Sequence, residues 1–396
     1  MTGQFRFSDL PEYAFPRLRR LLDGVPPGGP ARHLSIGEPK HEMPPFLADH
    51  LAAAVAGFAK YPNNNGIPEL LEVIGNWLKR RFQTDVDPES QVMVLNGTRE
   101  GLFNAVLALT SDAGPQRPAI LIPNPFYQVY AVGALAAQAD PIFVNATKDT
   151  GFLPDYASLP EDILDRTAIA FVCTPSNPQG AIASVEYLSD LIDLAEKHDF
   201  IIFSDECYSE IYSGTPPPGL LEVMKLKSAD PNRGLVFHSL SKRSNLPGLR
   251  SGFVAGGAEL ISELKRLRAY AGAPLPEPIQ SVSAAVWADE AHVKENRARY
   301  QRKYKMAQDI FASQADVTIP EAGFFLWLPV PNGEDETIKI WRETGIRVLP
   351  GSYLSRKQDG TDPGEAYIRV AMVAEETSLE ESLINLRDTI YGVQEA

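Results

Sequence analysis

Lys242 is the residue of this 396-residue sequence whose surroundings point most clearly to chemistry. It lies in "FHSLSKRSNLPGLRSGFVAGG", residues 237–257, directly after an apolar run and between serine hydroxyls, with Arg250 eight positions further on. A lysine in such a place can be a solvated loop charge, or it can be the amine that holds a cofactor. The rest of the sequence has to decide between these two interpretations.

Polar residues also follow other apolar, strand-like runs. Gly97 and Thr98 come after "VMVL" and open a helical segment, whose free backbone N–H groups suit a phosphate. One amide, one carboxylate, two tyrosines and two serines stand after the other runs: Asn177, Asp205, Tyr127, Tyr208, Ser239 and Ser241. Each could be an ordinary loop residue or a helix cap. Because five successive strand ends carry such residues, a binding site is favoured over ordinary loops.

These groups match the needs of one cofactor, pyridoxal 5′-phosphate. Its aldehyde binds a lysine amine, and its phosphate binds N–H groups and hydroxyls. Its ring nitrogen needs a carboxylate to stay protonated, its ring hydroxyl needs donors such as Asn and Tyr, and its flat ring needs an aromatic face. The sequence therefore predicts a pyridoxal phosphate site at the ends of the strands.

Seven short β-rich runs between about residues 92 and 255 would position this site. Several are separated by segments with helical spacing, such as residues 185–198. Strands that are apolar throughout and alternate with helices are typical of a mostly parallel sheet covered on both faces. We therefore predict an α/β domain, in which ligands bind beyond the carboxyl ends of the strands.

The C-terminal part has a different pattern. Residues 278–313 are expected to be mainly helical, and three strand candidates follow: "GFFLWLPV", "GIRVLPG" and "AYIRVAMV". This pattern predicts a second, smaller α+β domain. We expect an N-terminal arm and part of the small domain at 1–45, a large cofactor-binding domain at 46–285 and a C-terminal small domain at 286–396. The proline-rich arm has little periodicity and is expected to pack on another part of the molecule.

Composition narrows the class of protein. The formal net charge of −14 argues against nucleic-acid and anionic-membrane partners, because both would repel the chain. We find neither a signal peptide nor a membrane-spanning run, so a cytoplasmic location is expected. Cys173 and Cys207 are expected to be buried, reduced thiols, and their spacing predicts no metal site.

The motifs, in this order, resemble those of the fold-type I, class I/II aminotransferases over nearly the full chain. More narrowly, the sequence is similar to the bacterial succinyldiaminopimelate aminotransferases. The stretches that carry the resemblance are "SIGEPKH", "NGTREGLF", "PNPFYQVY", "SDECYSEIY" and residues 237–257. The resemblance implies a pyridoxal-phosphate-dependent transferase fold with a mostly parallel seven-stranded sheet and a smaller α+β domain.

The resemblance also implies roles for residues that would hold the cofactor. Lys242 would bind its aldehyde and later carry the proton, Asp205 would pair with its ring nitrogen, and Tyr127 would stack on its ring. Asn177 and Tyr208 would bind the ring oxygen. The phosphate would be held by Gly97, Thr98, Ser239, Ser241 and Arg250.

Other implied roles concern the substrate and a second subunit. Arg369, assisted by Gly37 and Asn177, would bind the substrate α-carboxylate. Tyr61 would reach the phosphate of the neighbouring subunit, which makes the protein a homodimer with shared active sites. The family's usual Asn-Pro-Thr-Gly has Gln179 in place of threonine here, and this side chain is expected to face away from the ring.

The expected reaction moves an amino group between N-succinyl-LL-2,6-diaminopimelate and 2-oxoglutarate, which becomes glutamate. Lys40, Arg99, Arg268 and the asparagines at 63–65 could bind the distal carboxylates, but each is more often a surface group, so none is assigned.

Three alternatives remain. One is a broader aspartate, aromatic or alanine aminotransferase, and another is a C–S lyase that uses the same cofactor. A regulatory module is less favoured, because the chain is acidic and only about 45 residues precede the catalytic region. A nucleotide-binding enzyme is also disfavoured, since no phosphate-loop motif occurs.

Overall fold

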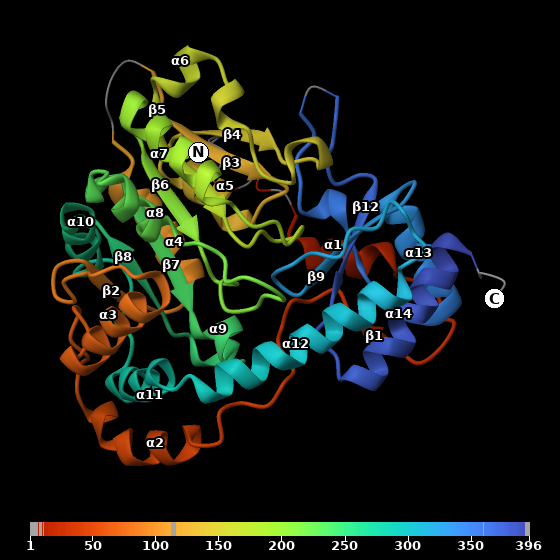
Figure 1. The fold of residues 1–396 in the computed structure, drawn as a ribbon, viewed down its shortest axis with the longest axis horizontal. Helices are drawn as coiled ribbons and strands as arrows, with labels where there is room; N and C mark the ends of the chain where they lie inside the picture. Colours follow the sequence, from red (N-terminus) through yellow and green to blue (C-terminus); the bar gives the residue numbers. More distant parts are fainter. Residues whose placement is uncertain (1–6, 8–9, 11, 112–115, 359, 393–396) are drawn as a thin grey trace, which may run out of the picture.

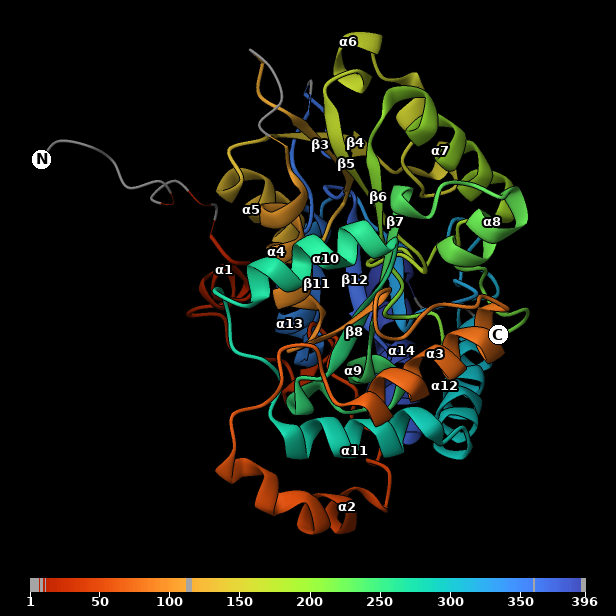
Figure 2. The same cartoon turned by 90° about the vertical axis from the view of Figure 1, so that its left-hand side faces the viewer.

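The structure is a computed structural model that describes residues 7, 10, 12–111, 116–358 and 360–392. Its largest layer is a seven-stranded sheet with the strand order β2-β8-β7-β6-β5-β3-β4 (Figures 1 and 2). The strands are β2 (Val92–Leu95), β3 (Ala119–Asn124), β4 (Asp140–Asn145), β5 (Thr167–Cys173), β6 (Ile201–Asp205), β7 (Gly234–Ser239) and β8 (Gly252–Gly256). Within this sheet β8 runs antiparallel to both of its neighbours, and the other pairs are parallel. The predicted α/β class and mostly parallel sheet are confirmed, and each of the seven apolar runs contains a strand.

The segments around this sheet are mostly helical. The α-helices are α2 (Leu47–Ala54), α3 (Pro68–Phe82), α4 (Thr98–Leu109), α5 (Gln128–Ala136), α6 (Glu161–Leu164), α7 (Val185–His198), α8 (Leu220–Lys227), α9 (Leu240–Arg243), α10 (Ala258–Arg268) and α11 (Glu277–Ala288). Short 3-10 turns are η1 (Val55–Ala59), η2 (Lys148–Thr150), η3 (Tyr156–Ser158), η4 (Pro231–Arg233) and η5 (Pro247–Leu249). The predicted helix at residues 185–198 is confirmed as α7.

Helices cover both faces of the sheet because successive strand residues point to opposite sides. In β2, Val94 packs in one core, whereas Met93 and Leu95 pack in the other. The first core joins α3, α7, α8 and α11 to the sheet, and the second joins α4, α5 and α10 to its opposite face. Both faces are therefore buried, as the continuous apolar strands predicted.

A smaller antiparallel sheet lies in the C-terminal part, in the order β11 (Leu349–Pro350), β12 (Tyr367–Ala371) and β9 (Phe325–Pro329). Helices α12 (Ala291–Ile310), α13 (Gly333–Thr344) and α14 (Glu376–Tyr391) contribute to a core of its own with this sheet. The turn η6 (Gly351–Tyr353) follows β11, and β10 (Ile346–Arg347) pairs with β1 (Arg32–His33). All three predicted strand segments contain strands. The domain boundaries near residues 46 and 286 stay a prediction, which the separate cores support.

The N-terminal arm contains a helix that the sequence analysis missed. Helix α1 (Ala14–Leu21) buries Ala14 and Leu18, and Leu22 follows at the same spacing. These side chains pack in one cluster with Trp341 and Tyr353 from the C-terminal part. The expectation of little periodicity was wrong for this stretch, because four-residue spacing places the three side chains on one helix face. The expected packing on another part of the molecule is confirmed for α1, whereas residues 1–6, 8–9 and 11 lie outside the described residues.

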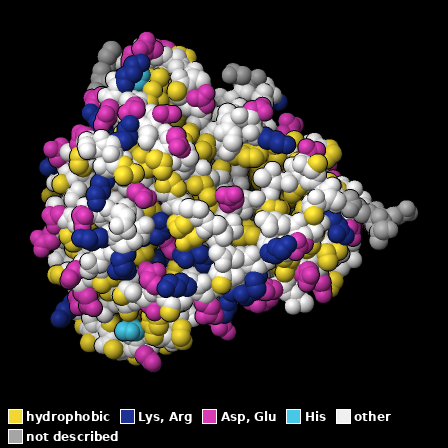
Figure 3. All heavy atoms as spheres, in the orientation of Figure 1, with side chains coloured by type: hydrophobic (Ala, Val, Ile, Leu, Met, Phe, Trp, Pro, Cys, Tyr) yellow, Lys and Arg dark blue, Asp and Glu magenta, His cyan; other side chains and the backbone are white. Residues whose placement is uncertain are grey.

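The surface carries both signs of charge. On the face shown in Figure 3, acidic and basic side chains are interspersed between groups of hydrophobic ones. No helix in the described ranges has both the length and the apolar character needed to cross a membrane.

Candidate active site

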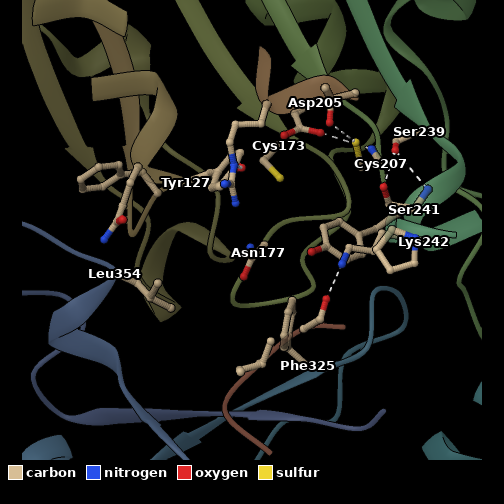
Figure 4. Close-up of a pocket in the computed structure, with 18 of the residues that line it drawn as sticks. Tyr127, Cys173, Asn177, Asp205, Cys207, Ser239, Ser241, Lys242, Phe325 and Leu354 are labelled. Atoms are coloured by element: carbon tan, nitrogen blue, oxygen red, sulfur yellow. Dashed lines mark hydrogen bonds between the residues drawn. The ribbon is translucent and has the colours of Figure 1, made fainter. Parts of the chain in front are cut away.

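A cavity of about 470 Å³ lies at the carboxyl ends of β5, β6 and β7, where the large sheet meets the N-terminal arm and the C-terminal part (Figure 4). All the predicted site residues except Gly97 and Tyr61 line it. Because β8 runs antiparallel to the other strands, its first residue lies at this same edge, which brings the preceding Arg250 to the cavity. The strand-end reasoning therefore located the cavity correctly.

Lys242 belongs to α9, which follows β7 directly. Its Nζ donates a hydrogen bond to the carbonyl oxygen of Gly37, drawn as a dashed line in Figure 4, and lies 5.3 Å from the centre of the Phe324 ring. Burial lowers the pKa of Lys242 to about 8, and the positive charges of Arg369 and Arg250 act in the same direction. An appreciable fraction of this amine is therefore neutral near neutral pH, as a nucleophile or general base requires.

Asp205 ends β6 and is 5% exposed. The hydroxyl of Tyr130 donates to its Oδ2 at 2.8 Å, and the backbone N–H of Cys207 donates to its Oδ1 at 3.3 Å. Burial raises the pKa of Asp205, although both of these hydrogen bonds oppose the shift. Within the described residues no cation forms an ion pair with this carboxylate. A cation placed beside Asp205 would therefore be its first counter-ion and would lower its pKa again.

The N-terminus of α4 and the segment from β7 to β8 form one polar corner of the cavity. Gly97 precedes α4 with φ +79°, and a Cβ at this position would collide with the Arg250 guanidinium. Thr98 begins the helix, so its backbone N–H has no partner within the helix. Ser239 Oγ and Ser241 Oγ are 2.9 Å apart. Helix N–H groups, hydroxyls and a guanidinium together suit a phosphate.

Arg369 approaches the cavity from β12. It is 4% exposed, donates to Asn177 Oδ1 at 2.9 Å and to the carbonyl of Ser35 at 2.8 Å, and lies 4.2 Å from the centre of the Phe325 ring. Burial lowers its pKa to about 10. Within the described residues its Nε has no hydrogen-bond partner. A buried guanidinium with no carboxylate partner and a free donor suits an incoming carboxylate.

Two of the three predicted cofactor tyrosines, Tyr127 and Tyr208, line the cavity. Tyr127 immediately precedes α5, and its hydroxyl accepts a hydrogen bond from Arg99 Nε at 2.6 Å. Tyr208 packs edge-on against Phe324 and Phe325, and burial raises its pKa well above the usual value. Tyr208 therefore remains protonated and able to donate a hydrogen bond.

Two predicted residues have other surroundings. Tyr61 is fully exposed and does not line the cavity of its own chain. Gln179 is buried but lies outside the cavity lining, in agreement with the expectation that it faces away. Among the residues considered for distal carboxylates, Arg99 alone lines the cavity, whereas Arg268 pairs with Glu100 at 2.6 Å.

Sequence reasoning missed several residues around the site. Tyr130, the partner of Asp205, stands three residues after Tyr127, so helical spacing could have identified it. Cys207 lies 3.2 Å from the Thr98 hydroxyl, and both cysteines are free thiols that line the cavity. No group of three His, Cys, Asp or Glu side chains able to hold a metal ion occurs in the described part of the chain.

The carboxylates of "SDECYSEIY" position this loop. Glu206 accepts hydrogen bonds from Ser204 and from the backbone N–H of Leu220, both at 2.8 Å. Glu210 accepts from Arg81 Nε of α3 at 2.7 Å and also pairs with Arg297 of α12. These contacts fix both ends of the loop that presents Asp205 and Tyr208.

Comparison with known proteins identifies the class of protein that the sequence motifs predicted. The family model described as "Aminotransferase class I and II" matches residues 32–382. An LL-diaminopimelate aminotransferase of Dehalococcoides mccartyi is 30% identical over 390 residues, which cover 96% of this chain and 97% of that protein.

Solved structures share the fold. An aminotransferase from Neisseria meningitidis has a TM-score of 0.93 at 39% identity, covering 97% of this chain and 99% of that one. A probable N-succinyldiaminopimelate aminotransferase from Thermus thermophilus has a TM-score of 0.81 at 22% identity, covering 95% and 98%, and shows the fold alone.

The chain belongs to the class I and II aminotransferases, enzymes that use pyridoxal phosphate. The residues present fit this cofactor. Among the described residues Asp205 has no counter-ion, and the ring nitrogen would supply one. Gly97 leaves room for Arg250 beside the helix N-terminus, and Lys242 has a lowered pKa. The chain is thus a pyridoxal-phosphate-dependent aminotransferase.

Proposed function

We propose that this aminotransferase moves an amino group between N-succinyl-LL-2,6-diaminopimelate and 2-oxoglutarate, a reaction of diaminopimelate and lysine biosynthesis. The observation that carries the proposal is one cavity lined by Lys242, Asp205, Arg369 and Arg99. It offers a reactive amine, a buried carboxylate and two guanidinium groups. An amino acid with a second acidic group matches this set of charges.

Lys242 would hold the cofactor and move the α-proton of the substrate. Pyridoxal phosphate, when bound, supplies an aldehyde for amino groups and an electron-withdrawing ring that acidifies the α-proton of the substrate. Lys242 Nζ would hold the aldehyde until a substrate amine displaces it. The freed neutral amine would then act as the base that takes the α-proton and delivers it to the cofactor carbon that carried the aldehyde.

The other cavity residues orient cofactor and substrate. Asp205 would hold the proton on the ring nitrogen, with Tyr130 fixing the carboxylate. Gly97, Thr98, Ser239, Ser241 and Arg250 would bind the phosphate, Tyr127 would stack on the ring, and Asn177 and Tyr208 would bind the ring oxygen. Arg369 would bind the substrate α-carboxylate through two N–H groups, with Gly37 and Asn177 beside it.

The lining of the cavity supports a succinylated donor. Asp205, already assigned to the cofactor, is the only carboxylate among the lining residues, whereas Arg99 is a cation without an ion-pair partner in the described part of the chain. Unmodified diaminopimelate would bring a second ammonium group, and no further carboxylate stands among the described lining residues to receive it. Succinylation removes that positive charge and adds a carboxylate, which Arg99 can bind.

Unsuccinylated LL-diaminopimelate is the second candidate. The relatives named LL-diaminopimelate aminotransferase are about as long as this chain and match it almost from end to end. They support a diaminopimelate-type donor but leave the succinyl group to be tested.

A homodimer with shared active sites is part of the proposal. Three large apolar side chains near α2 and η1, Val55, Phe58 and Tyr61, are exposed, and Tyr270 is exposed as well. Burial of such side chains against a second copy would remove apolar surface from water. Tyr61 would then reach the phosphate of the partner.

The proposal is tested by steady-state kinetics with a panel of amino donors and 2-oxoglutarate. We expect the highest kcat/KM with N-succinyl-LL-diaminopimelate and glutamate as product. A higher kcat/KM with LL-diaminopimelate would favour the second candidate, and preference for aspartate, alanine or an aromatic donor would contradict both. Release of pyruvate and ammonia without an oxo acid would identify a C–S lyase.

A further inference from the structure

A buried lysine outside the cavity begins a chain of polar contacts that ends at Lys242. Lys303 of α12 is 0% exposed, and its Nζ donates to His41 Nε2 at 2.7 Å and to the carbonyl of Met372 at 3.2 Å. Within the described residues no carboxylate forms an ion pair with Lys303. Burial lowers its pKa to about 8, although the charges of Glu375 and Glu376 oppose the shift. A buried lysine without a carboxylate is costly, so its position calls for an explanation.

The series of polar contacts continues from Lys303 through His41 and Asn296, and each residue donates a hydrogen bond to the next. His41 Nδ1 lies 2.8 Å from Asn296 Oδ1, and Asn296 Nδ2 lies 3.5 Å from the carbonyl oxygens of both Lys242 and Arg243. Because Lys303 donates to Nε2, His41 must be neutral with its proton on Nδ1, which donates to Asn296. Burial lowers the pKa of His41, and the nearby charge of Lys303 acts in the same direction. The amide of Asn296 is thus oriented to donate to α9.

The receiving end is α9, a short helix that depends on contacts with other elements. Helix α9 has four residues, fewer than an isolated helix needs, and the last carbonyls of a helix have no partners within it. Asn296, from α12, donates to the carbonyls of Lys242 and Arg243, the last two residues of α9. Asn245 Nδ2 donates to the same Oδ1 of Asn296 at 3.2 Å and anchors that amide from the other side.

The same series of polar contacts involves segments next to the residues that contact the Lys242 amine and would bind the substrate. Met372 directly follows β12, three residues after Arg369. His41 lies four residues after Gly37, whose carbonyl binds Lys242 Nζ. Helix α12 runs between the large sheet and the C-terminal part (Figures 1 and 2). Lys303, His41 and Asn296 therefore connect the Arg369 strand, the Gly37 segment and α9.

We infer that Lys303, His41 and Asn296 are positioning residues that fix the Lys242 peptide relative to Arg369. The inference rests on the proposed roles of Lys242 and Arg369, and it adds no contact with the cofactor or the substrate. Arg243 of α9 also donates to the carbonyls of Val286 and Trp287, so other contacts hold α9 against α11. The contacts of Lys303, His41 and Asn296 are the ones that link α9 to the residue directly after β12, and they therefore bear on the distance between the Lys242 amine and Arg369. Small errors of position at a reacting group have large effects on rate.

The test compares three variants with one control in the cofactor-loaded protein. Lys303→Met removes one polar group and leaves His41 and Met372 with unsatisfied acceptors. The double variant Lys303→Met/His41→Leu removes both polar groups and therefore restores much of the stability. Ile340→Val trims a buried side chain of the same core without touching the chain of contacts. Measured quantities are kcat, KM for the amino donor, melting temperature, and hydrogen exchange of the Ser244 and Leu246 amides, which bond the Leu240 carbonyl.

A positioning role predicts that the double variant melts close to the wild type, yet shows a kcat lower by roughly ten-fold and faster exchange at residues 240–246. Ile340→Val should lower only the melting temperature. If kcat and the exchange rates recover together with stability in the double variant, the chain of contacts is purely structural and the inference is wrong. Asn296→Ser, which removes only the last link, should reproduce the exchange effect. If the proposed function itself were wrong, the wild type would show no transamination, which differs from every outcome described for the variants.

Discussion

At the scale of single residues, the site depends on charges held out of water. Lys242 has a pKa near 8 because burial disfavours its ammonium form, and Asp205 and Arg369 are buried without counter-ions in the described part of the chain. Each of these groups would gain a partner when cofactor and substrate bind. The cavity is therefore prepared for charged ligands and is electrostatically incomplete without them.

The lowered pKa of Lys242 predicts how cofactor capture depends on pH. Only the neutral amine attacks an aldehyde, so the rate of covalent capture by the cofactor-free protein should rise with pH and level off above about 8. Stopped-flow absorbance over a series of pH values measures this rate. A midpoint near 10.5, the value of an ordinary lysine, would contradict the assigned environment.

Arg99 is predicted to determine acceptance of a distal carboxylate. Arg99→Gln removes a charge-assisted contact and should raise KM for glutamate and for the succinylated donor by about ten- to a hundred-fold. Alanine has no distal carboxylate, so its KM should stay unchanged and serves as the control. An equal rise for alanine and glutamate would show that Arg99 acts on the site in general.

At the scale of elements, the carboxyl ends of the parallel strands bring distant residues together. β6 delivers Asp205, β7 delivers Ser239, and the short α9 follows with Lys242. The loop after β6 is held by Glu210, which pairs with Arg81 of α3 and Arg297 of α12. These ion pairs connect the loop that carries Tyr208 to α3 and to α12.

Removal of the Glu210 carboxylate should therefore lower the free energy of unfolding. Glu210→Ala leaves Arg81 and Arg297 as largely buried cations without their carboxylate, and we expect a loss of about 3 kcal/mol in the free energy of unfolding. Urea denaturation of the cofactor-free protein measures this quantity. Glu380→Ala, at an exposed position of α14, is the control and should change it little. A loss for Glu210→Ala no larger than that of the control would show that the loop is held by other contacts.

Much of this architecture could be predicted from the sequence because its signals are local. Seven apolar runs marked the strands, and polar residues after them marked the cavity. Helix α1 was missed because Pro16 lies within its first turn, although Ala14, Leu18 and Leu22 share the spacing of one helix face. The contacts of Asn296 with α9 could not be predicted, since they join residues more than fifty positions apart and depend on how α12 packs.

At the scale of the whole molecule, the cavity lies where separate cores meet. The large sheet supplies Asp205, and α9, which follows β7, supplies Lys242. The C-terminal sheet supplies Arg369, and the N-terminal arm supplies Gly37. Tyr61 is the predicted site residue that points to a further contributor, because its side chain is fully exposed in the single chain. In the proposed homodimer, a second copy of the chain would complete the phosphate site.

Shared sites make a specific prediction for mixed dimers. Lys242→Ala should be inactive and Tyr61→Phe impaired when each is prepared alone. In a mixed dimer, one site combines the intact Lys242 of one chain with the intact Tyr61 of the other, so activity should recover to about half of the wild-type value per dimer. Co-expression with two different affinity tags isolates these dimers. No recovery above the Tyr61→Phe level would contradict a shared site.

The most direct test of the whole account is the visible absorption spectrum of the wild-type protein and of Lys242→Ala, each with pyridoxal phosphate, before and after addition of N-succinyl-LL-diaminopimelate. We predict that the wild type shows the band of a lysine-bound cofactor and that this band gives way to that of the aminated cofactor when the donor is added. Lys242→Ala should show neither the lysine-bound band nor turnover. A wild type without that band, or a Lys242→Ala variant that turns over like the wild type, would contradict the assignment of Lys242 and the mechanism that depends on it.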